Sequence, residues 1–237
     1  MCYIVFSRLL PATAVRFHNE GSCGLSKRDD VKSGRASGTE GYAEQAEELF
    51  ARYEAIPAAD MHRAVLHLIP TSPARVLDIG AGTGRDAAWF AAMGHRVVAV
   101  EPTAAMREPA MALHRSPAIE WLDDSLPELE ILRSRGEKFD LVMLTAVFMH
   151  LDAAERRRAM PNLASQLAPG GTLVMMLRHG PVPPGRRMFE VTAEETIELA
   201  RQHGLDPVLN LWTESSQPEN RAAGISWTSV AFTSTRC

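Results

Sequence analysis

The residues best suited to chemistry follow a short apolar run, Val76–Ile79, which leads into a loop with three glycines, Gly80-Ala81-Gly82-Thr83-Gly84. Glycines let a chain turn sharply and let its backbone approach a ligand where a Cβ would collide. A pyrophosphate-binding loop requires glycine where Arg85 stands, and the carboxylate of Asp78 would repel pyrophosphate. The pattern therefore favours a ligand that carries an ammonium group.

Two further apolar runs also end in acids. Val97–Val100 is followed by Glu101, a carboxylate that can accept hydrogen bonds from both hydroxyls of a ribose. Ile119–Leu122 runs into Asp123 and Asp124, which could accept from the exocyclic amine of a purine. Because the carboxyl ends of parallel strands share one edge of a sheet, these acids and the glycine loop should line one nucleoside-binding crevice.

Together these residues resemble the class I S-adenosylmethionine-dependent methyltransferases. The resemblance spans about residues 42–235 and also rests on Pro102-Thr103 after Glu101, on Phe139–Val142 and on Leu167–Leu173. It implies S-adenosylmethionine as cofactor, with the methionine moiety at Asp78 and the glycine loop, the ribose at Glu101 and the adenine at Asp123 or Asp124. The cofactor-binding residues expected from it are Asp78, Gly80, Ala81, Gly82, Gly84, Glu101, Pro102, Asp123, Asp124 and Thr145.

Methyl transfer from a sulfonium is an in-line displacement, so the protein chiefly has to align the acceptor and exclude water. If the acceptor must lose a proton, His150 is the best-placed base, five residues beyond the strand that ends at Thr145. An equally good interpretation is that His150 is a histidine of a loop or helix start whose hydrogen bonds go only to backbone groups. Asp86 is best explained as an acid in the first turn of a helix, where its negative charge interacts favourably with the helix dipole.

A second group of candidates would bind the acceptor. Residues 178–189 carry His179 and Arg187 in a proline-rich loop, which suggests an acceptor with a carboxylate or phosphate, although solvated surface arginines are the commoner case. Tyr42 is expected to cap the pocket from the first helix, whereas Tyr53 is expected to pack in the core. No spacing indicates a metal site.

The elements that must position these residues alternate between apolar runs and amphipathic stretches. Such alternation predicts right-handed crossovers and a doubly wound α/β fold, with a mostly parallel seven-stranded sheet. The last two strand-like runs, Pro207–Thr213 and Ser226–Thr233, are joined by a polar loop without a helix, so the last strand should be antiparallel. Helices are expected at Glu40–Tyr53 and Asp60–Leu68. The family resemblance implies that these two helices, at residues 40–70, act as lids over the cofactor.

The chain has 237 residues, which suits one domain at residues 40–237. Residues 1–39 are rich in Gly, Ser and basic residues without periodicity and are expected to form a disordered extension. The three cysteines lie near the chain ends, and no apolar run is long enough for a membrane span, so a cytoplasmic protein without a membrane partner is expected.

The formal net charge of -4 disfavours nucleic acid as a partner. The sequence thus predicts a methyltransferase acting on a small-molecule acceptor, which the arginine loop suggests is anionic. Two alternatives stay open. One is a non-catalytic module that binds S-adenosylmethionine, and the other is a nicotinamide-dependent oxidoreductase, which Arg85 and Asp78 disfavour.

Overall fold

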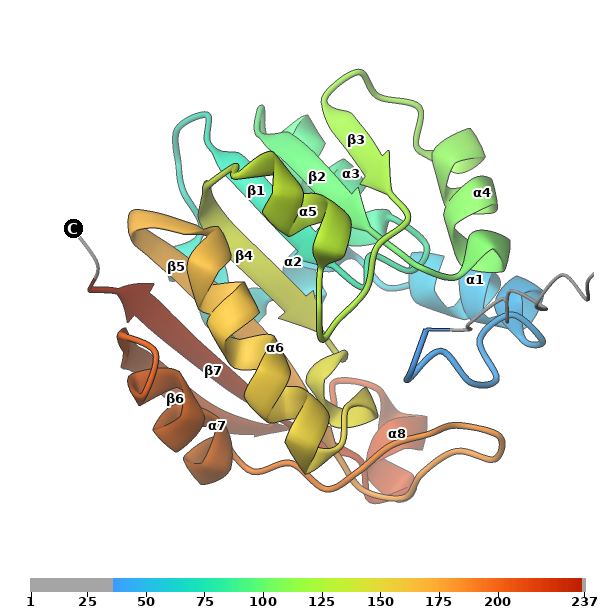
Figure 1. The fold of residues 1–237 in the computed structure, drawn as a ribbon. Helices are drawn as coiled ribbons and strands as arrows, with labels where there is room; N and C mark the ends of the chain where they lie inside the picture. Colours follow the sequence, from blue (N-terminus) through green and yellow to red (C-terminus); the bar gives the residue numbers. More distant parts are fainter. Residues whose placement is uncertain (1–35, 236–237) are drawn as a thin grey trace, which may run out of the picture. The chain divides into compact units, whose positions relative to one another are not determined.

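The computed structural model of the chain describes residues 36–235. These residues form one seven-stranded sheet in the order β3-β2-β1-β4-β5-β7-β6 (Figure 1). Strands β1 to β5 are parallel, while β7 pairs antiparallel with both β5 and β6. The predicted fold class and the antiparallel last strand are confirmed. The strands are β1 (Arg75–Ile79), β2 (Arg96–Val100), β3 (Ile119–Leu122), β4 (Phe139–Thr145), β5 (Leu167–His179), β6 (Leu205–Glu214) and β7 (Ser226–Ser234).

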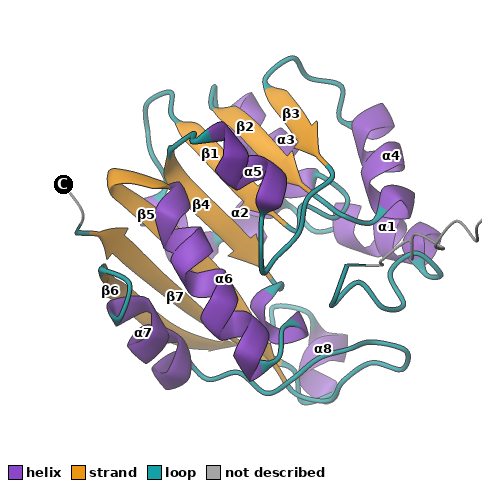
Figure 2. Ribbon diagram, in the orientation of Figure 1, coloured by secondary structure: helices purple, strands orange, loops and turns teal. Residues whose placement is uncertain are grey.

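Helices cover both faces of this sheet, with α5, α6 and α7 on the near face in the view of Figure 2 and α2 and α3 behind it. The helices are α1 (Ala46–Glu54), α2 (Ala58–Met61), η1 (Arg63–Leu68), α3 (Arg85–Ala92), α4 (Ala104–Leu113), α5 (Glu130–Arg135), η2 (Phe148–His150), α6 (Ala153–Gln166), α7 (Ala193–Arg201) and α8 (Pro218–Ala222), where η denotes a 3₁₀ helix.

Each face of the sheet has its own hydrophobic core because successive strand residues point to opposite sides. From β1, Leu77 joins the core beneath α6, which includes Leu163, whereas Val76 joins the core beneath α3, which includes Phe90. Strands buried on both faces read as continuous apolar runs, as they do here. The central strands are therefore rigid supports for the loops at their carboxyl ends.

Three elements differ from the sequence-based expectation. Residues 40–45 form turns, and the first helix begins only at Ala46. The expected helix Asp60–Leu68 is divided into α2 and the 3₁₀ helix η1. The loop before β7 contains α8, which starts with Pro218 and carries Glu219 in its first turn. Proline and an acid are typical of helix starts, so this short helix had a sequence signal.

The described part of the predicted extension contacts the domain. Ser37 donates from Oγ to Oε1 of Glu155 over 2.6 Å and accepts from Nη1 of Arg187 over 2.7 Å. The remaining residues of the expected extension, 1–35, lie outside the described residues.

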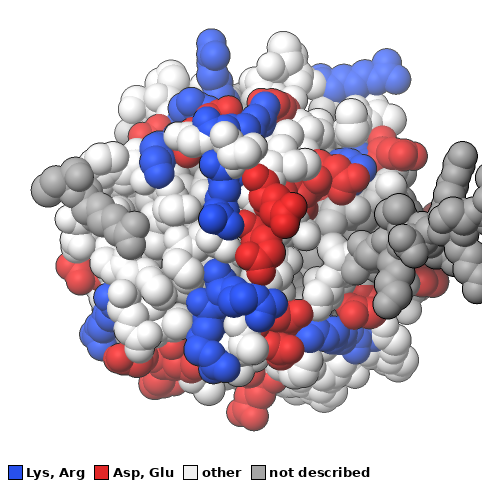
Figure 3. Space-filling view, viewed as in Figure 1, with Lys and Arg blue, Asp and Glu red and all other residues white. Residues whose placement is uncertain are grey.

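No helix within residues 36–235 is long and apolar enough to cross a membrane. On the face seen in Figure 3, basic and acidic side chains are interspersed, and they do not gather in a single basic patch.

Candidate active site

The glycine loop after β1 makes a close backbone approach to the segment after β4. Gly80 has φ +73°, and a Cβ placed there would lie 2.5 Å from Cγ2 of Val147. The amides of Gly80 and Ala81 both donate to the carbonyl of Val100, at 2.8 and 3.0 Å. The loop is thus held at the end of β2, it lines a cavity, and a side chain at Gly80 would collide with Val147.

Gly84 has a different role, because it does not line the cavity. It adopts φ +80°, and a Cβ there would lie 2.6 Å from the ring of Trp121. We expect Gly84→Ala to lower the free energy of unfolding by about 3 kcal/mol, from backbone strain plus overpacking. Gly94→Ala is the matched control, since φ is +92° there but no atom lies within 4 Å of the added Cβ.

Gly94→Ala should lower the free energy of unfolding by only about 1 kcal/mol, because it introduces backbone strain alone. Urea titration of both variants gives the comparison. Equal losses at Gly84 and Gly94 would show that packing against Trp121 contributes nothing.

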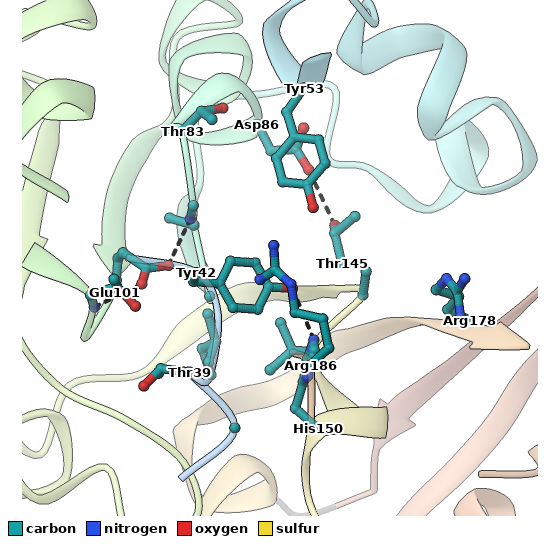
Figure 4. A pocket seen from close by; sticks show the side chains of 18 of the residues that line it. Thr39, Tyr42, Tyr53, Thr83, Asp86, Glu101, Thr145, His150, Arg178 and Arg186 are labelled. Atoms are coloured by element: carbon teal, nitrogen blue, oxygen red, sulfur yellow. Dashed lines mark hydrogen bonds between the residues drawn. The ribbon is translucent and has the colours of Figure 1, made fainter. Parts of the chain in front are cut away.

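Glu101, at the end of β2, is the central acid of the cavity. It is 7% exposed, and its Oε2 and Oε1 accept from the amides of Gly82 and Thr103, at 2.9 and 2.8 Å (Figure 4). Burial raises the pKa of Glu101, and these backbone donors counter that effect. A carboxylate has about four acceptor positions, so Glu101 can still accept a hydrogen bond from a ligand.

The two aspartates after β3 point in different directions. Asp124 lines the cavity, and its carboxylate accepts from the amides of Ser125 and Leu132 at 2.9 and 2.8 Å. Asp123 does not line the cavity, and its carboxylate is paired with Arg107 at 2.8 Å. The side chain of Asp123 is 64% exposed, so of the two aspartates only Asp124 lines the cavity.

A buried polar network lies behind the glycine loop, centred on Asp86, which sequence reasoning explained by the helix dipole alone. Its Oδ2 accepts from Nε2 of His62 at 2.7 Å and from Oγ1 of Thr145 at 3.1 Å, while Oδ1 accepts from Nε of Arg85 at 2.8 Å. Burial raises the pKa of Asp86, but His62 and Arg85 outweigh it and hold that pKa well below its usual range. Asp86 thus links the loop after β1 to the end of β4.

Asp78 lies at the edge of this network and outside the cavity lining. It is 2% exposed, and its Oδ2 has no hydrogen-bond partner among the described residues. Burial raises the pKa of Asp78 well above its usual range, and the nearby charge of Asp86 raises it further. Any effect of Asp78 on a ligand would have to pass through the glycine loop.

At the other end of the cavity, Tyr42 meets His150 of η2. The hydroxyl of Tyr42 lies 3.0 Å from Nε2 of His150, and Nδ1 of His150 lies 2.7 Å from the carbonyl oxygen of Arg187. A carbonyl only accepts, so Nδ1 carries the proton and neutral Nε2 accepts from Tyr42. Burial lowers the pKa of His150 and raises that of Tyr42, which favours this arrangement of protons.

The loop after β5 presents its arginines in opposite directions. Arg186 lines the cavity, with its guanidinium 3.7 Å from the centre of the Tyr42 ring (Figure 4). Arg187 points away and donates to Ser37, Glu155 and the carbonyl of His150, so its hydrogen bonds hold the chain together.

His179 is also outside the cavity, with Nε2 2.8 Å from the hydroxyl of Thr228, whereas Arg178 lines it. The structure thus separates the two residues expected to bind the acceptor, Arg187 and His179, from the cavity and brings in their neighbours Arg186 and Arg178.

One continuous cavity of about 330 Å³ joins these two ends. Tyr53, expected in the core, also lines it, as do Tyr42, His150 and Thr145. The predicted cofactor residues that line it are Gly80, Ala81, Gly82, Glu101, Pro102, Asp124 and Thr145. Such a volume lies at the lower end of the range of small-molecule sites.

Comparison with known proteins gives a consistent result. Residues 76–171 match a family model described as a methyltransferase domain. An uncharacterised methyltransferase of Oceanobacillus iheyensis is 28% identical over 162 residues, or 68% of this chain and 66% of that protein. Glycine N-methyltransferase of Rattus norvegicus is 31% identical over 135 residues, which are 48% of this chain and 46% of that protein. The chain thus spans less than two thirds of the length of either relative.

Among solved structures, the 1,6-didemethyltoxoflavin-N1-methyltransferase of Burkholderia thailandensis, with bound 1,6-didemethyltoxoflavin and S-adenosylhomocysteine, has the same fold. The TM-score is 0.65 at 24% identity, covering 82% of this chain and 86% of that one. The matched domain, the relatives and the shared fold agree with the resemblance seen in the sequence and confirm it. This chain thus resembles the class I S-adenosylmethionine-dependent methyltransferases in a matched methyltransferase domain at residues 76–171 and in its fold.

Proposed function

We propose that this protein transfers a methyl group from S-adenosylmethionine to a small-molecule acceptor. The observation that carries the proposal is one cavity lined by the glycine loop and Glu101 together with Tyr42 and His150. A group-transfer enzyme needs its donor and acceptor sites to be continuous, so that the reacting atoms can meet in line.

The residues at the first end fit the cofactor. The backbone of Gly80, Ala81 and Gly82 lines the cavity, and the carboxylates of Asp86, Glu101 and Asp124 favour a ligand with a positively charged sulfonium and ammonium. In this proposal Glu101 binds the ribose hydroxyls and Asp124 faces the adenine. The glycine loop and the β4 end at Thr145 hold the methionine part.

When bound, the cofactor supplies an electrophilic methyl group, whose bond to sulfur breaks as the acceptor attacks. The chain's own part is to align the acceptor and, where needed, remove its proton. His150 is the proposed base, but its Nε2 is occupied by the Tyr42 hydroxyl. The proton would therefore pass from the acceptor to Tyr42 Oη while the proton of Tyr42 moves to His150.

The test is to incubate the purified chain and a metabolite extract with S-adenosylmethionine that carries an isotopically labelled methyl group. We expect one acceptor, or a small related set, to gain the mass of the label only when the protein is present. Tight binding of S-adenosylmethionine without any labelled product would favour the non-catalytic binding module.

A further inference from the structure

Arg186 has a binding capacity that its protein contacts do not use. Its Nη2 donates to Oε1 of Gln45 at 2.8 Å, and its guanidinium stacks on Tyr42, so its orientation is fixed. Its Nη1 is buried and has no hydrogen-bond partner among the described residues. A buried charged donor without a partner is costly, which favours a ligand that can accept from it.

The charges around this end of the cavity favour an anion. Arg178 also lines the cavity (Figure 4). It is anchored by its own donation to the carbonyl of Pro181 at 2.9 Å. The carboxylates that line the cavity within the described residues are Asp86, Glu101 and Asp124, and each already accepts hydrogen bonds from the chain itself. An anion at Arg186 would therefore meet a guanidinium nitrogen that has no partner among the described residues, with the positive charge of Arg178 on the same cavity.

The other walls here indicate the body of such a ligand. Aromatic and aliphatic side chains dominate them, namely Tyr42, Tyr53, Met188, Ile225 and Trp227. The cavity of about 330 Å³ also has to hold the cofactor, so an acceptor that binds there should be small. Flat apolar walls with one fixed guanidinium suit a ring that carries a carboxylate.

We propose that Arg186, supported by Arg178, binds the carboxylate of a small aromatic acid and so selects the acceptor. This inference rests on the proposed function and names its substrate class. The carboxylate of the cofactor's methionine part has the same chemistry, so the experiment must distinguish the two sources.

The probes are 2-, 3- and 4-hydroxybenzoate, each beside its uncharged carboxamide. Isothermal titration measures their binding to the full chain saturated with S-adenosylhomocysteine. We expect at least one acid to bind the wild-type protein tenfold or more tightly than its amide. Arg186→Gln should abolish this preference while changing the Kd of S-adenosylhomocysteine less than twofold, and Arg186→Lys should retain part of it.

Arg52→Gln is the matched control, because Arg52 is an exposed cation that lines the same cavity. It should keep the preference for the acid. Equal binding of acid and amide, no binding of any acid, or an equal loss in Arg52→Gln would overturn the inference.

A tenfold loss of S-adenosylhomocysteine affinity in Arg186→Gln would assign the arginine to the cofactor instead, which also overturns it. Failure of the wild-type chain to bind S-adenosylhomocysteine at all would instead contradict the proposed function.

Discussion

Glu101→Gln is expected to weaken the binding of S-adenosylmethionine about a hundredfold. The carboxylate would lose two charge-assisted hydrogen bonds to the ribose, each worth about 1.5–3 kcal/mol, and tenfold in affinity corresponds to about 1.4 kcal/mol. The glutamine amide would also place a donor against the amide of Gly82 or Thr103, both of which donate to Glu101. Isothermal titration measures the change directly.

Asp123→Asn provides the matched control, because Asp123 is an acid on the neighbouring strand that points out of the cavity. Its affinity for the cofactor should stay within threefold of the wild-type value.

Because Glu101 also anchors the glycine loop, its replacement could weaken binding by disordering the loop. A second measurement separates this effect from the loss of the ribose contact. The wild-type chain should discriminate against the 2′-deoxy analogue of S-adenosylhomocysteine, and Glu101→Gln should not. Equal discrimination by both proteins would remove the ribose contact from the account.

Tyr42→Phe and His150→Ala should each lower kcat about a hundredfold on the acceptor that gains the labelled methyl group. Both substitutions interrupt the path from the acceptor through Tyr42 Oη to His150 Nε2, and general-base catalysis typically contributes 10²–10⁴-fold. The phenylalanine ring can still stack with Arg186, so KM should change little in Tyr42→Phe. Steady-state kinetics gives both constants.

The pH profile provides a second, independent readout of the same relay. Burial and the positive charges of Arg186 and Arg178 lower the pKa of His150, while its bond to the Arg187 carbonyl and the charge of Glu40 raise it, with a net lowering. A base acts in its neutral form, so activity should persist as the pH falls through 6.5 and decline only below that value. Full turnover in both variants would show that alignment alone drives the reaction.

The sequence was informative where local pattern and sheet topology fix the position of a residue. Glu101 ends a buried apolar strand, and the glycine loop follows the neighbouring strand, so a parallel sheet brings them together. Both sites line the cavity as expected. Their roles toward the cofactor stay predictions until binding is measured.

Side-chain direction in the irregular loop could not be predicted in this way. Arg186 and Arg187 are adjacent, yet one lines the cavity and the other is bonded to Glu155 and Ser37. No periodicity fixes which side of an irregular loop a residue faces, so nothing in the sequence separated the two arginines.

The Asp86 network was missed for a related reason. The helix dipole already explains an acid such as Asp86 in the first turn of α3. Its partner His62 lies 24 residues earlier in the chain. The signal that could have found it is a histidine in the segment that precedes the glycine loop, but only the folded chain shows that the two meet.

A crystal structure of the full chain with S-adenosylhomocysteine is the most direct test of the central claim. We expect the ribose hydroxyls to lie within hydrogen-bond distance of the Glu101 carboxylate. We expect the sulfur to face the side of the cavity that Tyr42 lines. An adenosyl group bound anywhere else, or a ribose turned away from Glu101, would contradict it.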